Sequence, residues 1–152
     1  MLTVTPFLWF DNQAEEAMNL YLSIFPNSRS LAVHGAPGRV MSVEFELEGQ
    51  KIMAMNAGPQ FKFNESVSFF VGCDTQAQVN ELWDKLTANG GEPSRCGWLK
   101  DRFGLSWQII PKTLGQLLGG GGDPARSKRV LDAMLQMARI DEATLQRAYD
   151  GQ

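Results

Sequence analysis

Several features that would place the chain in a common functional class are missing from its sequence. It has no basic run, because 14 Lys and Arg are outnumbered by 17 Asp and Glu, and the net charge is −3. Nucleic-acid binding depends on clustered cations, so this composition argues against it. No apolar stretch approaches the roughly 18 residues of a membrane span, and residues 1–6 lack the charged and apolar regions of a signal peptide. We therefore expect a cytoplasmic protein with neither nucleic acid nor membrane as a partner.

Histidine and cysteine are also scarce. The only cysteines are Cys73 and Cys96, and the only histidine is His34. In a reducing cytoplasm the two cysteines are expected to be free thiols. Apolar material, in contrast, is plentiful: 43% of the 152 residues are hydrophobic, with nine Phe and four Trp. This is enough for one domain, or for two small halves that share a core, and it excludes a disordered chain.

The hydrophobic pattern predicts the same order of elements twice. The first set is a strand over 3–10, a helix that ends at Pro26, and strands over 28–36, 39–48 and 50–57. The second set is a strand over 67–73, a helix that ends at Asn89, and shorter strands over 92–97, 98–102 and 105–110. Alternating apolar residues indicate the strands, and apolar residues three or four apart indicate the helices.

A short sequence repeat supports this doubling. The residues DNQA at 11–14 lie between the first strand and its helix, and DTQA at 74–77 does the same 63 residues later. Asn12 with Glu15, and Thr75 with Gln78, have the spacing of a helix capping box. We interpret the chain as two βαβββ modules, about 1–58 and 66–112.

The last forty residues have a different pattern. Four consecutive glycines at 119–122 are expected to form a flexible linker. Asp123 and Pro124 then suit a helix N-cap and first turn. A second helix is expected from Asp141 to Tyr149. We expect residues 113–152 to form a helical tail that packs on the sheet or on a partner subunit.

Three sequence runs resemble one known family. They are TPFLWF at 5–10, MAMNAGP at 53–59 and CGWLKDRFGLSWQ at 96–108. Together with the doubled module, they resemble the PhnB-like (demethylubiquinone methyltransferase-like) branch of the vicinal-oxygen-chelate superfamily, which includes glyoxalase and bleomycin-resistance proteins. The resemblance extends over the tail. It implies an α+β fold in which residues 1–112 form an open barrel-like sheet, and a homodimer.

The resemblance also locates where a metal would be expected. Metal-dependent members of the superfamily carry His, Glu or Gln at four positions, which fall here at about Thr5, Met53, Ser68 and Gln108. Only Gln108 could bind a metal, as a neutral oxygen donor. We therefore expect neither a metal nor another cofactor.

Strand alternation should direct some aromatic side chains, together with Gln108, into the concave sheet. The candidate ligand-binding residues are Trp9, Asn56, Phe69, Trp98, Trp107 and Gln108. Such a lining predicts the binding of a small, mainly apolar metabolite. Two alternatives stay open: a metal-dependent or metal-free enzyme of the glyoxalase/dioxygenase type, and a protein-interaction module.

Other candidates have weaker support. The glycines at 119–122 do not follow a strand, unlike the glycine-rich turn of common S-adenosylmethionine enzymes, so methyl transfer is disfavoured. Cys96 lies near Lys100 and Arg102 but has no histidine base nearby in the sequence. Asp101 is expected in a solvated turn or an ion pair, or else as the cap of a loop at the cavity mouth.

Overall fold

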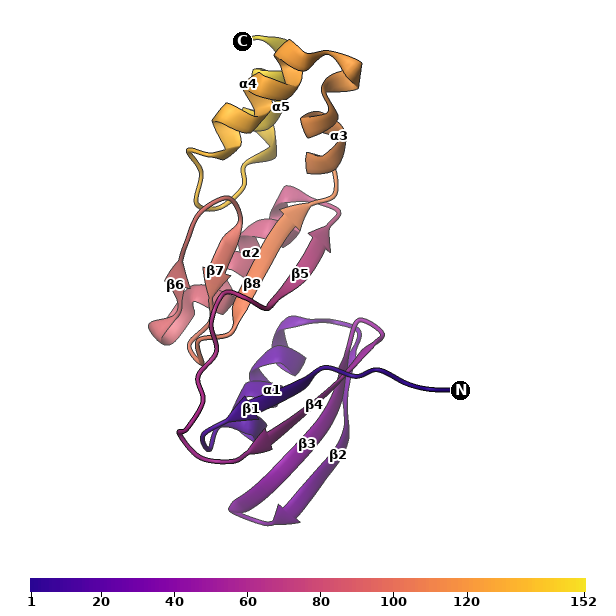
Figure 1. The fold of residues 1–152 in the computed structure, drawn as a ribbon, viewed down its shortest axis with the longest axis vertical. Helices are drawn as coiled ribbons and strands as arrows, with labels where there is room; N and C mark the ends of the chain where they lie inside the picture. Colours follow the sequence, from indigo (N-terminus) through magenta and orange to yellow (C-terminus); the bar gives the residue numbers. More distant parts are fainter. The chain divides into compact units, whose positions relative to one another are not determined.

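The computed structural model describes residues 1–152, which divide into two compact units, Met1–Lys62 and Phe63–Gln152. Each unit is built on its own four-stranded mixed sheet (Figure 1). None of the helices has both the length and the apolar character needed to span a bilayer.

The first unit contains one complete βαβββ module. Its elements are β1 (Phe7–Phe10), α1 (Ala14–Ile24), β2 (Ser28–Ala36), β3 (Arg39–Leu47) and β4 (Gln50–Asn56). The strand order is β1-β4-β3-β2, and only the β1–β4 pair is parallel. Period-2 alternation buries Val43, Phe45 and Leu47 on the face that packs against α1. The opposite face of this sheet carries the alternate residues, and α1 does not pack on it.

The capping box expected for α1 is wrong. The N-cap residue is Gln13, and neither Asn12 nor Glu15 caps the helix. Instead, the amide N–H of Ala14 donates to Oδ1 of Asn56, 2.8 Å away at the end of β4. A residue distant in sequence therefore satisfies a free donor of the first turn.

The second unit repeats the same topology. Its module contains β5 (Ser68–Cys73), α2 (Gln76–Thr87), a 3₁₀ turn η1 (Ala88–Gly90), β6 (Glu92–Pro93), β7 (Trp98–Lys100) and β8 (Ser106–Pro111). The strand order is β5-β8-β7-β6, with β5 and β8 parallel. Here the expected N-cap is confirmed, because Thr75 Oγ1 accepts a hydrogen bond from the Gln78 amide at 3.1 Å. The Gln78 side chain accepts from the Asp74 amide at 2.7 Å, one residue before the N-cap. The predicted pair of βαβββ modules is therefore confirmed.

Three further helices complete the second unit (Figure 1). They are α3 (Leu114–Gly119), α4 (Pro124–Met134) and α5 (Glu142–Asp150), and the glycine segment predicted as a linker forms a 3₁₀ turn, η2 (Gly120–Gly122). The apolar side chains of these helices pack with the end of β8 in one buried cluster, which consists of Ile110, Leu114, Leu117, Val130, Ile140 and Leu145. Gln76 of α2 also donates to the Ile140 carbonyl at 2.9 Å and accepts from the Glu142 amide at 2.8 Å. The tail thus packs on its own module.

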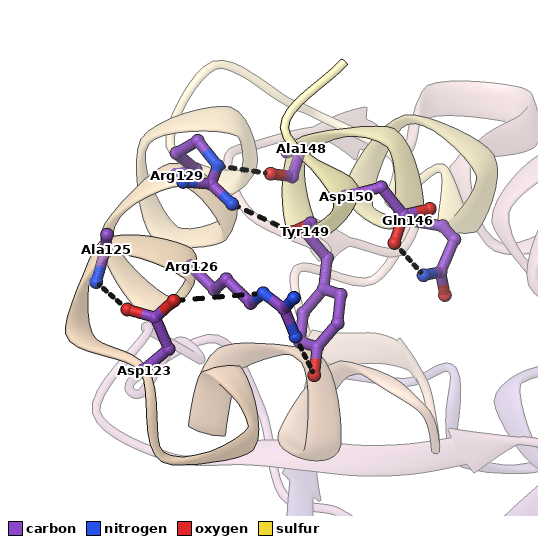
Figure 2. Close-up of polar contacts among 8 residues, drawn as sticks. All are labelled: Asp123, Ala125, Arg126, Arg129, Gln146, Ala148, Tyr149 and Asp150. Atoms are coloured by element: carbon purple, nitrogen blue, oxygen red, sulfur yellow. Dashed lines mark hydrogen bonds and ion pairs between the residues drawn. The ribbon is translucent and has the colours of Figure 1, made fainter.

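Two arginines of α4 hold the end of α5 (Figure 2). Arg129 donates to the carbonyls of Ala148 and Tyr149 at 2.8 and 2.9 Å, which satisfies free acceptors at the C-terminus of α5. The Arg126 guanidinium lies over the Tyr149 ring, 4.9 Å from its centroid. Gly121 lies against the same ring with φ +60°, and a Cβ there would be 2.7 Å from the Tyr149 hydroxyl. Tyr149 therefore connects α4, α5 and the glycine turn.

Candidate functional site

Strand pairing sorts the aromatic residues of the second sheet onto two faces. Trp107 pairs with Phe69 on β5, and Gln108 pairs with Phe70 on β5 and Trp98 on β7. Neighbouring residues of one strand point to opposite faces. Trp107 is 1% exposed on the face that packs against α2, whereas Phe70 is 63% exposed on the open face. Of the candidate residues, Trp98 and Gln108 therefore share the open face, while Phe69 and Trp107 lie together on the covered face.

The covered face is anchored by Asp101. This side chain is 2% exposed, so the expected solvated turn is wrong. Its carboxylate accepts the amide N–H groups of Phe103 and Leu105 at 2.9 and 3.1 Å, and the indole N–H of Trp107 at 2.9 Å. Buried carboxylates are tolerated when they accept several hydrogen bonds. Asp101 therefore sets the turn between β7 and β8 and fixes the start of β8.

Gln108 lies on the open face with half of its amide engaged. Its Nε2 donates to Ser68 Oγ at 2.9 Å, across the β5–β8 pair. The other end of the amide makes no hydrogen bond within the chain. An amide held at one end and free at the other can orient a polar group of a ligand.

A pocket of about 210 Å³ opens beside Trp98. Its lining consists of Glu65, Glu92, Pro93, Ser94, Trp98, Leu99, Lys100 and Ser106. Ser106 is completely buried, and its Oγ has no hydrogen-bond partner. Lys100 forms an ion pair with Glu65 at the pocket wall. Of this lining, Trp98 was predicted from the sequence as a ligand-binding candidate, but Ser106 and Glu65 were missed, although alternation places Ser106 on the same face of β8 as Gln108.

In the first unit, the open face carries Trp9. The indole N–H of Trp9 donates to the Gly58 carbonyl at 2.9 Å, and its ring packs edge-on against Phe61 with centroids 4.9 Å apart. Trp9 pairs with Met55 on the neighbouring strand, and Phe7, two residues earlier, is 51% exposed. This face therefore presents apolar side chains that the helix of this unit does not cover.

Asn56 has a different position from Trp9. It pairs with Phe10 on the face that contacts α1. Its Oδ1 accepts from the Ala14 amide, and its Nδ2 donates to the Val40 carbonyl at 2.9 Å. Both ends of the amide thus hold β4 to α1 and β3, and a ligand contact by Asn56 stays a prediction.

The residues at the superfamily's metal positions do not fit a resident divalent cation. Met53 offers a thioether, while Ser68 and Gln108 are hydrogen-bonded to each other. No three His, Cys, Asp or Glu side chains lie close enough together to hold a metal ion. His34 is instead bonded to Glu44, with 3.2 Å between Nε2 and Oε2. The hydrogen bonds from His34 and then Lys51 hold the pKa of Glu44 below its usual value.

The two cysteines are both free thiols, as expected. Burial raises the pKa of Cys73 to about 11, so its thiol is protonated at neutral pH and is a poor nucleophile. Cys96 lies beneath the tail, where its thiol donates to the Met134 carbonyl across 3.6 Å. Neither cysteine lines the pocket beside Trp98.

Comparison with known proteins identifies the family. The model of the family described as 3-demethylubiquinone-9 3-methyltransferase matches residues 2–110. The chain belongs to this family, in the PhnB-like branch of the vicinal-oxygen-chelate superfamily. The match ends at residue 110, so the resemblance expected over the tail is not part of it. A search of curated proteins found no significant match.

Solved structures agree with this assignment. A PhnB protein from Bacillus cereus is 30% identical with a TM-score of 0.66, and the alignment covers 72% of this chain and 99% of that chain. A Pseudomonas aeruginosa protein is 20% identical with a TM-score of 0.57, over 70% of this chain and 95% of that one. The fosfomycin resistance protein FosX from Listeria monocytogenes is 17% identical with a TM-score of 0.51, over 76% and 94%. The last two show a shared fold only.

The family description names a methyl transfer, but this PhnB-like chain lacks the corresponding nucleotide-binding features. Its glycine cluster follows helix α3, not a strand. Its sheets are mixed, whereas the common S-adenosylmethionine enzymes use a parallel βαβ unit. The word methyltransferase is therefore only the name of the family, and it does not assign a reaction to this chain.

Proposed function

We propose that this PhnB-like protein binds a small, mainly apolar molecule against the open faces of its sheets. The observation that supports this best is the position of Trp98, whose half-buried ring lines the 210 Å³ pocket. Gln108 lies next to it on the same face, with one end of its amide free. The pocket combines the apolar residues Pro93, Trp98 and Leu99 with polar ones, and small-molecule sites likewise combine apolar surface with oriented polar groups.

The first unit supports the same proposal independently. Its open face carries Phe7, Trp9, Met53 and Met55 on the adjacent strands β1 and β4. Aromatic and methionine side chains bind flat apolar groups well, because methionine adapts its shape and aromatic rings stack. Such a surface without a covering helix is an expected feature of a binding site.

Binding is better supported than catalysis. The titratable side chains that line the pocket are Glu65, Glu92 and Lys100, and Glu65 is already paired with Lys100. A metal-dependent enzyme has less support because the donor set does not fit a metal. A metal-free enzyme would need one of the two carboxylates as its base.

A nuclear magnetic resonance titration tests the proposal. Benzyl alcohol, a small uncharged aromatic probe, is added to the ¹⁵N-labelled full chain while the four indole N–H signals are followed. We expect the Trp98 signal to shift saturably. Trp107, which is buried and bonded to Asp101, provides an internal control and should not shift. An unmoved Trp98 signal at saturating probe would contradict the proposal.

A further inference from the structure

The pocket beside Trp98 has a polar end that an apolar ligand leaves unused. Ser106 is 0% exposed, and its Oγ makes no hydrogen bond. Folded proteins contain few buried polar groups without partners, because such a group loses its bonds to water and gains none in return. Ser106 lies in the pocket wall, so its hydroxyl can donate to a bound molecule once the side chains that cover it move aside.

A lysine is the cross-strand neighbour of Ser106. Lys100 pairs with Ser106 across strands β7 and β8 and lines the same pocket. Its ion pair with Glu65 raises the pKa of Lys100, and Glu92, opposite it on β6, adds a weaker attraction. Lys100 is therefore charged at every physiological pH. The hydroxyl and the ammonium group belong to residues that line one pocket, and both are donors suited to a carboxylate.

The two partners of the ion pair are held differently. Lys100 belongs to β7, which is paired on both sides, and its side chain is 36% exposed. Glu65 lies in the irregular segment between β4 and β5, and its side chain is 61% exposed. Exposed ion pairs contribute little to stability, so Glu65 can leave Lys100 at small cost. Glu65 is thus the replaceable partner.

We propose that the pocket binds the carboxylate of a small organic acid. In the free protein the Glu65 carboxylate occupies the ligand's position beside Lys100, and the ligand displaces Glu65 when it binds. The ligand carboxylate accepts from Lys100 Nζ and Ser106 Oγ, while its apolar body lies against Trp98. This proposal rests on the proposed function and narrows its ligand to an amphipathic acid.

Three aromatic probes of similar size but different charge test the proposal: benzoate, its neutral isostere benzamide, and the cation benzylammonium. Each is titrated into the full chain, and the Trp98 indole signal reports binding. We expect benzoate to bind about tenfold more tightly than benzamide, the usual gain of a charge-assisted hydrogen bond. Lys100→Met should remove that preference. Glu65→Gln should raise benzoate affinity about three- to tenfold, because the competing carboxylate is gone.

Matched variants control for net charge. Lys85 and Glu81 form an i,i+4 ion pair of similar exposure, 45% and 62%, on α2 of the same unit. Neither residue lines the pocket. Lys85→Met and Glu81→Gln change the net charge equally but should leave benzoate affinity unchanged. If the variants at Lys85 and Glu81 changed benzoate affinity as much as those at Lys100 and Glu65, the effect would come from net charge. That result would overturn the carboxylate site.

Ser106→Ala separates a binding role from a structural one. We expect it to weaken benzoate binding about fivefold while Tm stays the same or rises, because an unpaired buried hydroxyl is removed. A fall in Tm with unchanged benzoate affinity would assign Ser106 a structural role and overturn its part in the site.

The outcomes distinguish this proposal from the one on which it rests. Equal affinity of benzoate and benzamide, with Trp98 shifting in both, overturns the carboxylate site and leaves apolar binding intact. Tighter binding of benzylammonium would assign the pocket to Glu65 and Glu92 instead. No Trp98 shift with any of the three probes would overturn both proposals. Unchanged benzoate affinity in Glu65→Gln would overturn the competitor role of Glu65.

Discussion

The indole N–H of Trp107 donates to Oδ2 of Asp101 across 2.9 Å, and both side chains are buried. The other carboxylate oxygen accepts the backbone amides of Phe103 and Leu105. One side chain therefore holds the turn before β8 and the second residue of that strand. By fixing Trp107 on the covered face, it also directs Ser106 and Gln108 to the open face.

Asp101→Asn should destabilise the protein strongly. The amide would present an N–H group to the indole N–H or to the turn amides, leaving a buried donor unpaired. We expect a loss of about 2–4 kcal/mol in the free energy of unfolding, measured with urea. Asp132→Asn, at an exposed ion pair of α4, is the control and should change stability by less than about 0.5 kcal/mol. Similar values for the two variants would contradict the anchoring role of Asp101.

Asn56→Ala should cost much more stability than Asn12→Ala. Asn56 bonds both the first turn of α1 and the Val40 carbonyl, whereas Asn12 makes no capping bond. We expect a loss of about 1–3 kcal/mol for Asn56→Ala and about 0–0.5 kcal/mol for Asn12→Ala. Chemical denaturation of both variants measures the difference. A larger loss of unfolding free energy for Asn12→Ala than for Asn56→Ala would support the capping box expected from the sequence.

Gln108→Leu should weaken binding of benzyl alcohol without unfolding the chain. The variant removes the free end of the amide, and the loss of one such hydrogen bond costs about 0.5–1.5 kcal/mol of binding free energy. The affinity is read from the Trp98 indole signal. Gln116→Leu, on the exposed surface of α3, is the matched control and should bind like the wild type. If Gln108→Leu also binds like the wild type, Gln108 does not contact the ligand.

Cys73 should make stability fall with rising pH. Its pKa is raised from 9.0 in a free thiol to about 11 in the folded state, chiefly by burial. Between these values the unfolded thiol loses its proton while the folded one keeps it, so deprotonation favours the unfolded chain. Urea denaturation at several pH values should show a decline from about pH 9 to 11 that is smaller in Cys73→Ala. Parallel curves for the two proteins would be inconsistent with a buried thiol.

Local pattern was sufficient to predict the two βαβββ modules. The strand over 28–36 has the predicted bounds, and the doubled βαβββ order is confirmed. Alternation of apolar and polar residues is imposed by the sheet itself, so it can be read from sequence. The α1 cap could not be predicted, because Ala14 and Asn56 meet only after β1 pairs with β4.

The sequence could not sort the candidate site residues by the face of the sheet on which they lie. Trp107 and Gln108 are neighbours in one strand and therefore point to opposite faces of the sheet. The predicted ligand-binding residues, which include both, cannot all line one face. Which face is open depends on where α2 packs, and only the tertiary structure shows this. The burial of Ser106 and the ion pair of Lys100 with Glu65 likewise depend on contacts between distant segments.

The most direct test of the central claim is a crystal structure of the full chain with 4-bromobenzyl alcohol bound. Anomalous scattering from the bromine locates the probe independently of the protein model. The account predicts a bromine peak in the pocket lined by Trp98, and no peak there in Trp98→Ala. Bromine peaks found only away from Trp98, or an equal peak in both proteins, would contradict it.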